Sequence, residues 1–205
     1  MNVRVKICGL TRVQDALDAV ESGADALGFN FFRRSPRYIS PRAAGKIIAE
    51  LPPFVAKVGI FVNASRAEVL RAIEASGIDT IQFHGDETPA FCTRFDLPVI
   101  KAFRVGAVAA LRQLPKFHTT AWLVDSAVPG QRGGTGTKGD WNLARQAVEL
   151  GRPVILAGGL TPANVAEAIR EVRPFGVDVS SGVESQPGIK DPRKVRSFVA
   201  NAKAR

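Results

Sequence analysis

The fold is decided by the opening stretch Val3-Arg4-Val5-Lys6-Ile7-Cys8-Gly9-Leu10-Thr11. Apolar side chains alternate with charged or polar ones as far as Cys8, which is the period-two pattern of a β-strand. We therefore expect a strand over Val3–Cys8, with its apolar side chains against helices and Cys8 on the opposite face. A dinucleotide-binding fold requires the pattern G-x-G-x-x-G directly after such a strand. The residues after Cys8 do not match it, which favours a closed barrel over that fold.

The segment that follows has helical spacing. Thr11–Ser22 contains apolar residues three or four positions apart, which form one face of an amphipathic helix. Thr11 is the expected N-cap, with Gln14 completing a capping box, and Gly23 is the expected residue beyond the C-terminus. Because parallel strands are joined by a crossover that is usually a helix, the strand and helix together predict one βα unit.

The same alternation recurs along the chain. Expected strands are Val3–Cys8, Ala26–Phe31, Ala56–Val62, Thr80–Phe83, Val99–Ala102, Ala121–Val124, Val154–Ala157 and Gly176–Val179. Expected helices are Thr11–Ser22, Pro41–Glu50, Ala64–Ser76, Thr88–Phe95, Val108–Leu114, Trp141–Leu150, Pro162–Val172 and Pro192–Ala202, three of which begin with the cap-plus-proline pairs Ser40-Pro41, Thr161-Pro162 and Asp191-Pro192. Eight units in 205 residues predict an α/β fold, a (β/α)8 TIM barrel, as a single minimal-size domain over residues 1–205.

Composition excludes several classes of protein. Apolar residues make up 45% and charged residues 23%, with a mean hydropathy of +0.03, as in ordinary globular proteins. No apolar run approaches the ~18–20 residues of a membrane span, and the N-terminus lacks the apolar core of a secretory signal. Two cysteines do not make a disulfide framework. We therefore expect a cytoplasmic protein with no membrane partner.

The net charge of +9 arises from 28 basic and 19 acidic residues. A nucleic-acid partner is disfavoured, because the basic residues are scattered and no aromatic stacking motif accompanies them. A positive field also speeds the capture of small anions. An anionic small-molecule substrate is therefore the expected ligand.

Chemistry in a barrel of this kind lies at the C-terminal ends of the strands. Cys8 ends the first strand, Gln82 and His84 end the fourth, and Asp125 follows the sixth. A thiol and a carboxyl group at such positions are candidate proton-transfer groups. The second cysteine, Cys92, falls in a helical run and is expected to be an ordinary core side chain.

Two glycine-rich strand ends predict a phosphate site. Gly158-Gly159 follows the seventh strand, and Ser180-Ser181-Gly182 follows the eighth, ahead of a helical turn expected over Val183–Ser185. Barrel phosphate sites are built from these two loops and a short helix N-terminus, although ordinary tight turns are the alternative. A third glycine-rich stretch, Gly133-Gly134-Thr135-Gly136, is interpreted as a mobile flap. Two long loops, Phe32–Ser40 and Ser126–Asp140, are expected to be functional.

Several motifs follow one another in a specific order along the chain. They are Lys6-Ile7-Cys8-Gly9-Leu10-Thr11, Gly23-Ala24-Asp25-Ala26-Leu27-Gly28-Phe29, Ser35-Pro36-Arg37-Tyr38-Ile39, Gly59-Ile60-Phe61-Val62-Asn63, Gln82-Phe83-His84-Gly85, Gly133-Gly134-Thr135-Gly136, Gly158-Gly159-Leu160-Thr161-Pro162-Ala163-Asn164-Val165 and Val177-Asp178-Val179-Ser180-Ser181-Gly182-Val183-Glu184. Taken together, they resemble the phosphoribosylanthranilate isomerase family of tryptophan biosynthesis, and the resemblance covers the whole chain. Small departures from the family pattern occur at Asn30, Gly139 and Ala157, none at a catalytic position.

This resemblance implies an Amadori rearrangement of N-(5-phosphoribosyl)anthranilate by general acid and base catalysis. It assigns the base to Cys8, the acid to Asp125 and the substrate carboxylate to Arg37. Such a reaction requires no cofactor and no metal, because the iminium intermediate is itself an electron sink. Further substrate-binding residues are expected at Gln82, His84, Gly158, Gly159, Ser180, Ser181 and Gly182.

Alternatives remain at this point. Another phosphate-binding barrel enzyme acting on a phosphorylated sugar is the main one, although a metal-dependent epimerase would need more histidines than His84 and His118. A barrel without activity would be expected to lack Cys8 or Asp125. The sequence leaves open whether the protein is a monomer or a homodimer and whether the analogous histidine-pathway substrate is accepted.

Overall fold

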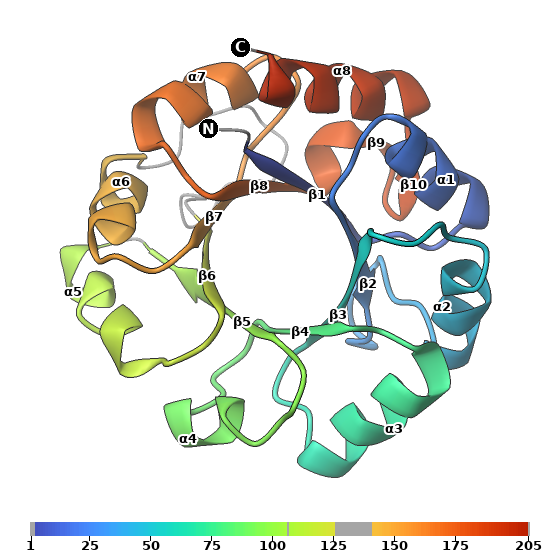
Figure 1. The fold of residues 1–205 in the computed structure, drawn as a ribbon, viewed down its shortest axis with the longest axis horizontal. Coiled ribbons are helices and arrows are strands. Elements are labelled where there is room, and N and C mark those ends of the chain that lie inside the picture. The colour runs from blue at the N-terminus through green and yellow to red at the C-terminus, as the bar shows by residue number, and fades with distance from the viewer. Residues whose placement is uncertain (1–2, 106, 126–140, 205) are drawn as a thin grey trace.

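A computed structural model of the protein describes residues 3–105, 107–125 and 141–204. Eight parallel strands form a closed barrel in which every strand pairs with its neighbours in sequence and β1 pairs with β8 (Figure 1). This confirms the predicted (β/α)8 barrel. The strands are β1 (Arg4–Cys8), β2 (Ala26–Asn30), β3 (Ala56–Phe61), β4 (Thr80–Phe83), β5 (Val99–Arg104), β6 (Ala121–Asp125), β7 (Val154–Ala157) and β8 (Gly176–Val179).

The helices form a ring around the barrel (Figure 1). They are α1 (Val13–Glu21), α2 (Pro41–Ile48), α3 (Arg66–Ser76), α4 (Pro89–Cys92), α5 (Val108–Leu111), α6 (Trp141–Glu149), α7 (Val165–Val172) and α8 (Pro192–Lys203), with a 3-10 turn η1 (Leu114–Lys116) after α5. Two predicted caps are confirmed: Ser40 accepts a hydrogen bond from Ala43 N, and Asp191 accepts from Arg193 N. Each such cap stabilises its helix by ~1 kcal/mol.

Apolar side chains fill two separate regions. Most of the core lies between the strands and the helices, where the side chains predicted to face the helices, Val3, Val5 and Ile7, are buried. Inside the barrel a smaller cluster fills the space between facing strands, as interior layers of branched side chains do. Its members are Val58, Ile100, Ala102, Ala121, Leu123, Ile155 and Ala157, with Ala26 packed against them.

Two predicted helix caps, Thr11 and Thr161, are wrong. The N-cap of α1 is Arg12, without a side-chain cap, because the Thr11 hydroxyl donates instead to the carbonyl oxygen of Gly188, 2.5 Å away. Helix α7 begins at Val165 rather than Pro162. The preceding residues form a turn that Asn164 holds, since its amide accepts from Thr161 N and donates to the carbonyl of Gly159.

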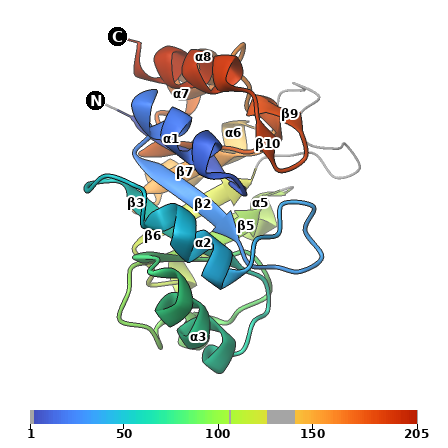
Figure 2. The same ribbon diagram turned by 90° about the vertical axis from the view of Figure 1, so that its right-hand side faces the viewer.

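The predicted helical turn over Val183–Ser185 is also wrong. A 3-10 turn η2 (Ser181–Val183) comes two residues earlier and is followed by a two-stranded hairpin, β9 (Glu184–Gln186) and β10 (Ile189–Lys190). In Figure 2 this hairpin and the loop after β2 lie on the same side of the molecule. The hairpin contacts the loop after β2 through the pair Arg37 and Glu184.

Within the described residues, no helix is long and apolar enough to cross a membrane. The loop Ser126–Asp140, with the interpreted flap Gly133-Gly134-Thr135-Gly136 and the departure at Gly139, lies outside the described residues. The loop Phe32–Ser40 is described. Asn30, the last residue of β2, holds it: the Asn30 side chain accepts from Phe32 N and donates to the Ser35 hydroxyl.

Candidate active site

A cavity of about 310 Å³ opens at the C-terminal ends of the strands. It is lined by every residue that the sequence placed in the site, from the first, second, fourth, sixth, seventh and eighth βα units. These residues are Cys8, Arg37, Gln82, His84, Asp125, Gly158, Gly159, Ser180, Ser181 and Gly182. The volume is at the lower end of the ~300–1,000 Å³ range of small-molecule sites.

The two glycine-rich loops meet at one rim of this cavity, as predicted. Gly158 and Gly159 adopt left-handed backbone angles, φ +91° and +64°, which glycine tolerates best. A Cβ on Gly182 would stand 1.9 Å from the carbonyl oxygen of Leu160. Only glycine therefore allows the β8 loop to approach the β7 loop this closely, and the close approach brings two stretches of backbone together at one rim.

Cys8 lies at the end of β1, half-buried, with its sulfur beside Gly28 of β2: a Cβ on Gly28 would be 3.1 Å from Sγ. Burial raises the pKa of the Cys8 thiol above its ordinary value. The Lys6 ammonium opposes that rise, through its charge and as a hydrogen-bond donor to the thiol, and Lys190 opposes it through charge.

Lys6 and Asp178 form a buried ion pair beneath the cavity. They are register partners on β1 and β8, and Lys6 Nζ donates to Asp178 Oδ1 at 2.8 Å. Burial opposes the Lys6 charge, but Asp178 and Cys8 together raise the net pKa of the ammonium above its ordinary value. Sequence reasoning assigned neither residue to the site, although Lys6 shares its strand face with Cys8.

Asp125 ends β6 and faces the same cavity as Cys8, from a strand that is separated from β1 by β7 and β8. It pairs in register with Ala157. The thiol and the carboxyl group thus approach one cavity from different sides, which is the arrangement expected of an acid and a base acting on a single bound molecule.

Gln82 and His84 lie side by side at the end of β4. Gln82 Nε2 is 3.2 Å from His84 Nδ1, and burial lowers the pKa of the imidazole. Gln82 is 1% exposed, and its Oε1 has no hydrogen-bond partner among the described residues. The Ser180 hydroxyl is likewise buried without a partner. Because unsatisfied buried polar atoms are costly, these two atoms are suited to hydrogen bonds with a ligand.

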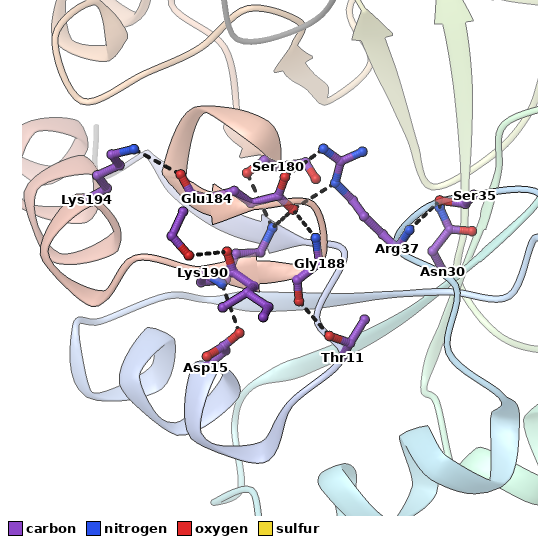
Figure 3. A network of polar contacts seen from close by, with 12 residues as sticks. Thr11, Asp15, Asn30, Ser35, Arg37, Ser180, Glu184, Gly188, Lys190 and Lys194 are labelled. Carbon is purple, nitrogen blue, oxygen red and sulfur yellow. Dashed lines mark hydrogen bonds and ion pairs between the residues drawn. The ribbon is translucent and has the colours of Figure 1, made fainter.

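Arg37 reaches the cavity from the loop after β2, and Glu184 of β9 holds its guanidinium by two hydrogen bonds (Figure 3). The Arg37 side chain is 23% exposed and Glu184 only 5%. Glu184 and its second partner, Lys190, are further residues that sequence reasoning did not assign. Glu184 is the last residue of the motif that begins at Val177, but nothing in the neighbouring sequence indicates that its partner is Arg37.

Within the described residues, no group of three or more His, Cys, Asp or Glu side chains is placed to hold a metal ion. Cys92 is buried in α4, as predicted, and its pKa is raised to about 11, mainly by burial.

Comparison with known proteins identifies the family. The family model described as N-(5′-phosphoribosyl)anthranilate (PRA) isomerase matches residues 5–201. This chain belongs to that family. The N-(5′-phosphoribosyl)anthranilate isomerase of Citrifermentans bemidjiense is 54% identical over 200 residues, which cover 98% of this chain and 97% of that protein.

Solved structures of such isomerases superpose closely on the barrel. The Thermotoga maritima enzyme is 43% identical with a TM-score of 0.94, covering 99% of this chain and all of that one. A structure of monomers of that enzyme, which is described as dimeric, is 40% identical with a TM-score of 0.89 and the same coverage. A phosphoribosyl anthranilate isomerase in complex with reduced 1-(o-carboxyphenylamino)-1-deoxyribulose 5-phosphate is 42% identical with a TM-score of 0.90, again with the same coverage. The protein is accordingly an isomerase of tryptophan biosynthesis, which confirms the predicted family and activity.

Proposed function

We propose that the cavity at the barrel mouth converts N-(5-phosphoribosyl)anthranilate to 1-(2-carboxyphenylamino)-1-deoxyribulose 5-phosphate, with Asp125 as general acid and Cys8 as general base. The observation that carries this assignment is the joint placement of both side chains on one cavity of about 310 Å³, whose rim is formed by the two glycine-rich loops. Each proton transfer by a positioned side chain of this kind increases the reaction rate by ~10²–10⁴-fold.

The chemistry needs one proton donor and one acceptor. Asp125 protonates the furanose ring oxygen, the C1′–O bond breaks, and the anilino nitrogen donates its lone pair to form the iminium. The Cys8 thiolate then removes the proton from C2′, and the C–H electron pair neutralises the iminium to give the enolamine. Protonation at C1′ and loss of the enol proton complete the aminoketose. Because the iminium accepts the electrons in these steps, the reaction needs no added cofactor or metal.

A thiol acts as a base only as the thiolate, and the buried site opposes that form. Lys6 is the main group that favours it, because its ammonium faces the thiol and is kept charged by Asp178. We infer that this pair maintains the thiolate fraction of Cys8. Among the described residues, Lys190 and Arg37 are further cations whose charge acts on the thiol.

The remaining groups bind the ends of the substrate. The loops that contain Gly158, Gly159, Ser181 and Gly182 receive the phosphate, and Arg37 receives the aryl carboxylate, for which a guanidinium edge is well shaped. The unpartnered Gln82 Oε1 and the Ser180 hydroxyl are suited to the ribose hydroxyls.

Assembly as a homodimer rests on the N-terminal face of the barrel. Phe54 is fully exposed there, in a left-handed backbone conformation with φ +67°, beside an apolar cavity of about 310 Å³ that includes Val58 and Ile100. An exposed phenylalanine next to a pocket on the same face makes a self-complementary surface, as a two-fold interface requires. We propose that a second copy covers this face, as the dimeric description of the Thermotoga maritima enzyme suggests.

The proposed location is the cytoplasm, because both cysteines are unpaired and a free Cys8 thiol must stay reduced. The decisive test of function is turnover of freshly prepared N-(5-phosphoribosyl)anthranilate by the wild type and by the Cys8→Ala and Asp125→Asn variants. Wild-type turnover, with at least ~10²-fold loss in each variant, supports the assignment. Absence of wild-type turnover, or variants with full activity, contradicts it.

A further inference from the structure

The β9–β10 hairpin places a buried carboxylate against the side chain expected to bind the substrate carboxylate. Arg37 Nε donates to Glu184 Oε1 at 2.8 Å, and Arg37 Nη2 donates to Glu184 Oε2 at 2.7 Å. The two residues are far apart in sequence and meet only at the mouth of the barrel. A bidentate pair of this kind fixes the plane of the guanidinium as well as its position.

Glu184 is itself held from several directions (Figure 3). Its Oε1 accepts from Lys190 Nζ at 2.9 Å and from Gly188 N at 3.2 Å. Lys194 Nζ donates to the Glu184 carbonyl oxygen at 2.9 Å. The carboxylate therefore has little freedom to rotate, and Arg37 is aimed by a rigid anchor rather than by a mobile surface group.

The anchored guanidinium keeps donors for a ligand. Arginine has five N–H donors. Among the described residues, Glu184 takes one from Nε and one from Nη2, which leaves both donors of Nη1 and the second of Nη2. One donor of Nη1 and the remaining donor of Nη2 lie along the Nη1–Nη2 edge, and Arg37 lines the cavity. That edge has the spacing for a second bidentate pair with a carboxylate.

The charges and the space agree with this arrangement. Among the described ion pairs, Arg37 and Lys190 bring two positive charges to the single negative charge of Glu184, and this excess favours anions at the mouth, the Cys8 thiolate and the substrate carboxylate among them. The Arg37 stem also passes directly over Gly9, where a Cβ would stand 2.5 Å from its Cδ. The Gly9 backbone and the β9–β10 hairpin together restrict the conformation of the Arg37 side chain.

We propose that Glu184 is a positioning residue that sets the preference for a carboxylated aryl group by aiming the free edge of Arg37 at it. The inference rests on the proposed role of Arg37 in binding the substrate carboxylate. Glu184 does not touch the substrate and takes no part in proton transfer.

The test compares two substrates, N-(5-phosphoribosyl)anthranilate and the aniline analogue that lacks the carboxylate, with Glu184→Gln. We expect the KM for the carboxylated compound to rise ~10-fold or more, with kcat within ~3-fold, and the aniline analogue to be unaffected. A second variant, Glu184→Gln with Lys190→Met, guards against misfolding, because it removes the buried cation together with its partner. It should show the same carboxylate-specific rise in KM, while any change in kcat should be equal for the two compounds, because the Lys190 charge also acts on the Cys8 thiol.

Glu87→Gln is the matched control, because Glu87 is also a buried carboxylate paired with a lysine, Lys101, at 3.1 Å. It should reduce stability while affecting both compounds alike. Equal effects on the two compounds from both Glu184 variants would overturn the inference.

Arg37→Ala separates this inference from the proposal on which it rests. A loss confined to the carboxylated compound supports the role of Arg37, and adding Glu184→Gln to Arg37→Ala should then change the KM no further. A loss that is equal for both compounds means that Arg37 does not bind the carboxylate, and the proposed role fails. A carboxylate-specific loss in Arg37→Ala without one in Glu184→Gln means that Arg37 binds but Glu184 does not aim it.

Discussion

Replacing Gly182 with alanine tests the phosphate site by a defined displacement. The added Cβ would stand 1.9 Å from the Leu160 carbonyl oxygen and 3.0 Å from its carbon. Both are backbone atoms, so no change of rotamer relieves the overlap. Since Cβ contacts below 3.0 Å are essentially never seen, the β7 and β8 loops must separate by about 1.1 Å.

That displacement falls on the groups proposed to hold the phosphate. A misplacement of ~1 Å in a positioning element costs up to ~10²-fold in rate. We therefore expect Gly182→Ala to raise the KM for N-(5-phosphoribosyl)anthranilate by ~10–10²-fold and to weaken competitive inhibition by inorganic phosphate in parallel. Steady-state kinetics with and without phosphate measure both quantities.

The control is Gly77→Ala, at the C-cap of α3. Gly77 has φ +70° and no neighbouring atom within 4 Å of the added Cβ. Its cost is backbone strain alone, ~1–2 kcal/mol of stability, so its melting temperature should fall with the KM unchanged. A Gly182→Ala protein with wild-type KM and wild-type phosphate inhibition would refute the phosphate site. A lowered melting temperature with wild-type kinetics would show that the close approach serves stability only.

Four further outcomes are expected. Cys8→Ala should lose at least ~10²-fold in kcat while Cys92→Ala stays within a few-fold, and a Cys8→Ala enzyme near wild-type turnover would remove the base assignment. Because burial raises the pKa of Cys8 and only the thiolate accepts a proton, kcat/KM should still be rising with pH at the ordinary thiol pKa of about 8.5. Lys6→Met should move the midpoint of this pH profile to higher pH. An unchanged midpoint would show that Lys6 does not sustain the thiolate. Asp125→Asn should abolish turnover yet keep affinity for a product analogue within ~10-fold, whereas a parallel loss of affinity would make Asp125 a binding residue. Phe54→Ala should convert a homodimer to a monomer in sedimentation without changing kcat, and a protein that is monomeric before the substitution would contradict the proposed interface.

Local signals in the sequence were sufficient for the barrel itself. Short apolar or β-branched runs located all eight strands, with bounds within two residues of those observed, because the strands of a parallel barrel are buried on both faces. Capping failed where a distant partner competed: the Thr11 hydroxyl donates to Gly188 O, 177 residues away, and is not available to its own helix. The short α4 and α5 likewise end before the predicted helical runs do.

The strand ends, and with them Cys8, Asp125 and the two glycine-rich loops, could be predicted from local sequence, since in a parallel barrel every C-terminal end faces the same mouth. Which side chains meet there depends on how distant elements pack. Lys6 pairs with Asp178 across 172 residues, and Arg37 pairs with Glu184 across 147. The first contact depends on closure of the barrel between β1 and β8, and the second depends on the hairpin after η2. Periodicity and caps report which face of an element is buried and where it ends, but a long-range partner is set by the register at which distant elements close.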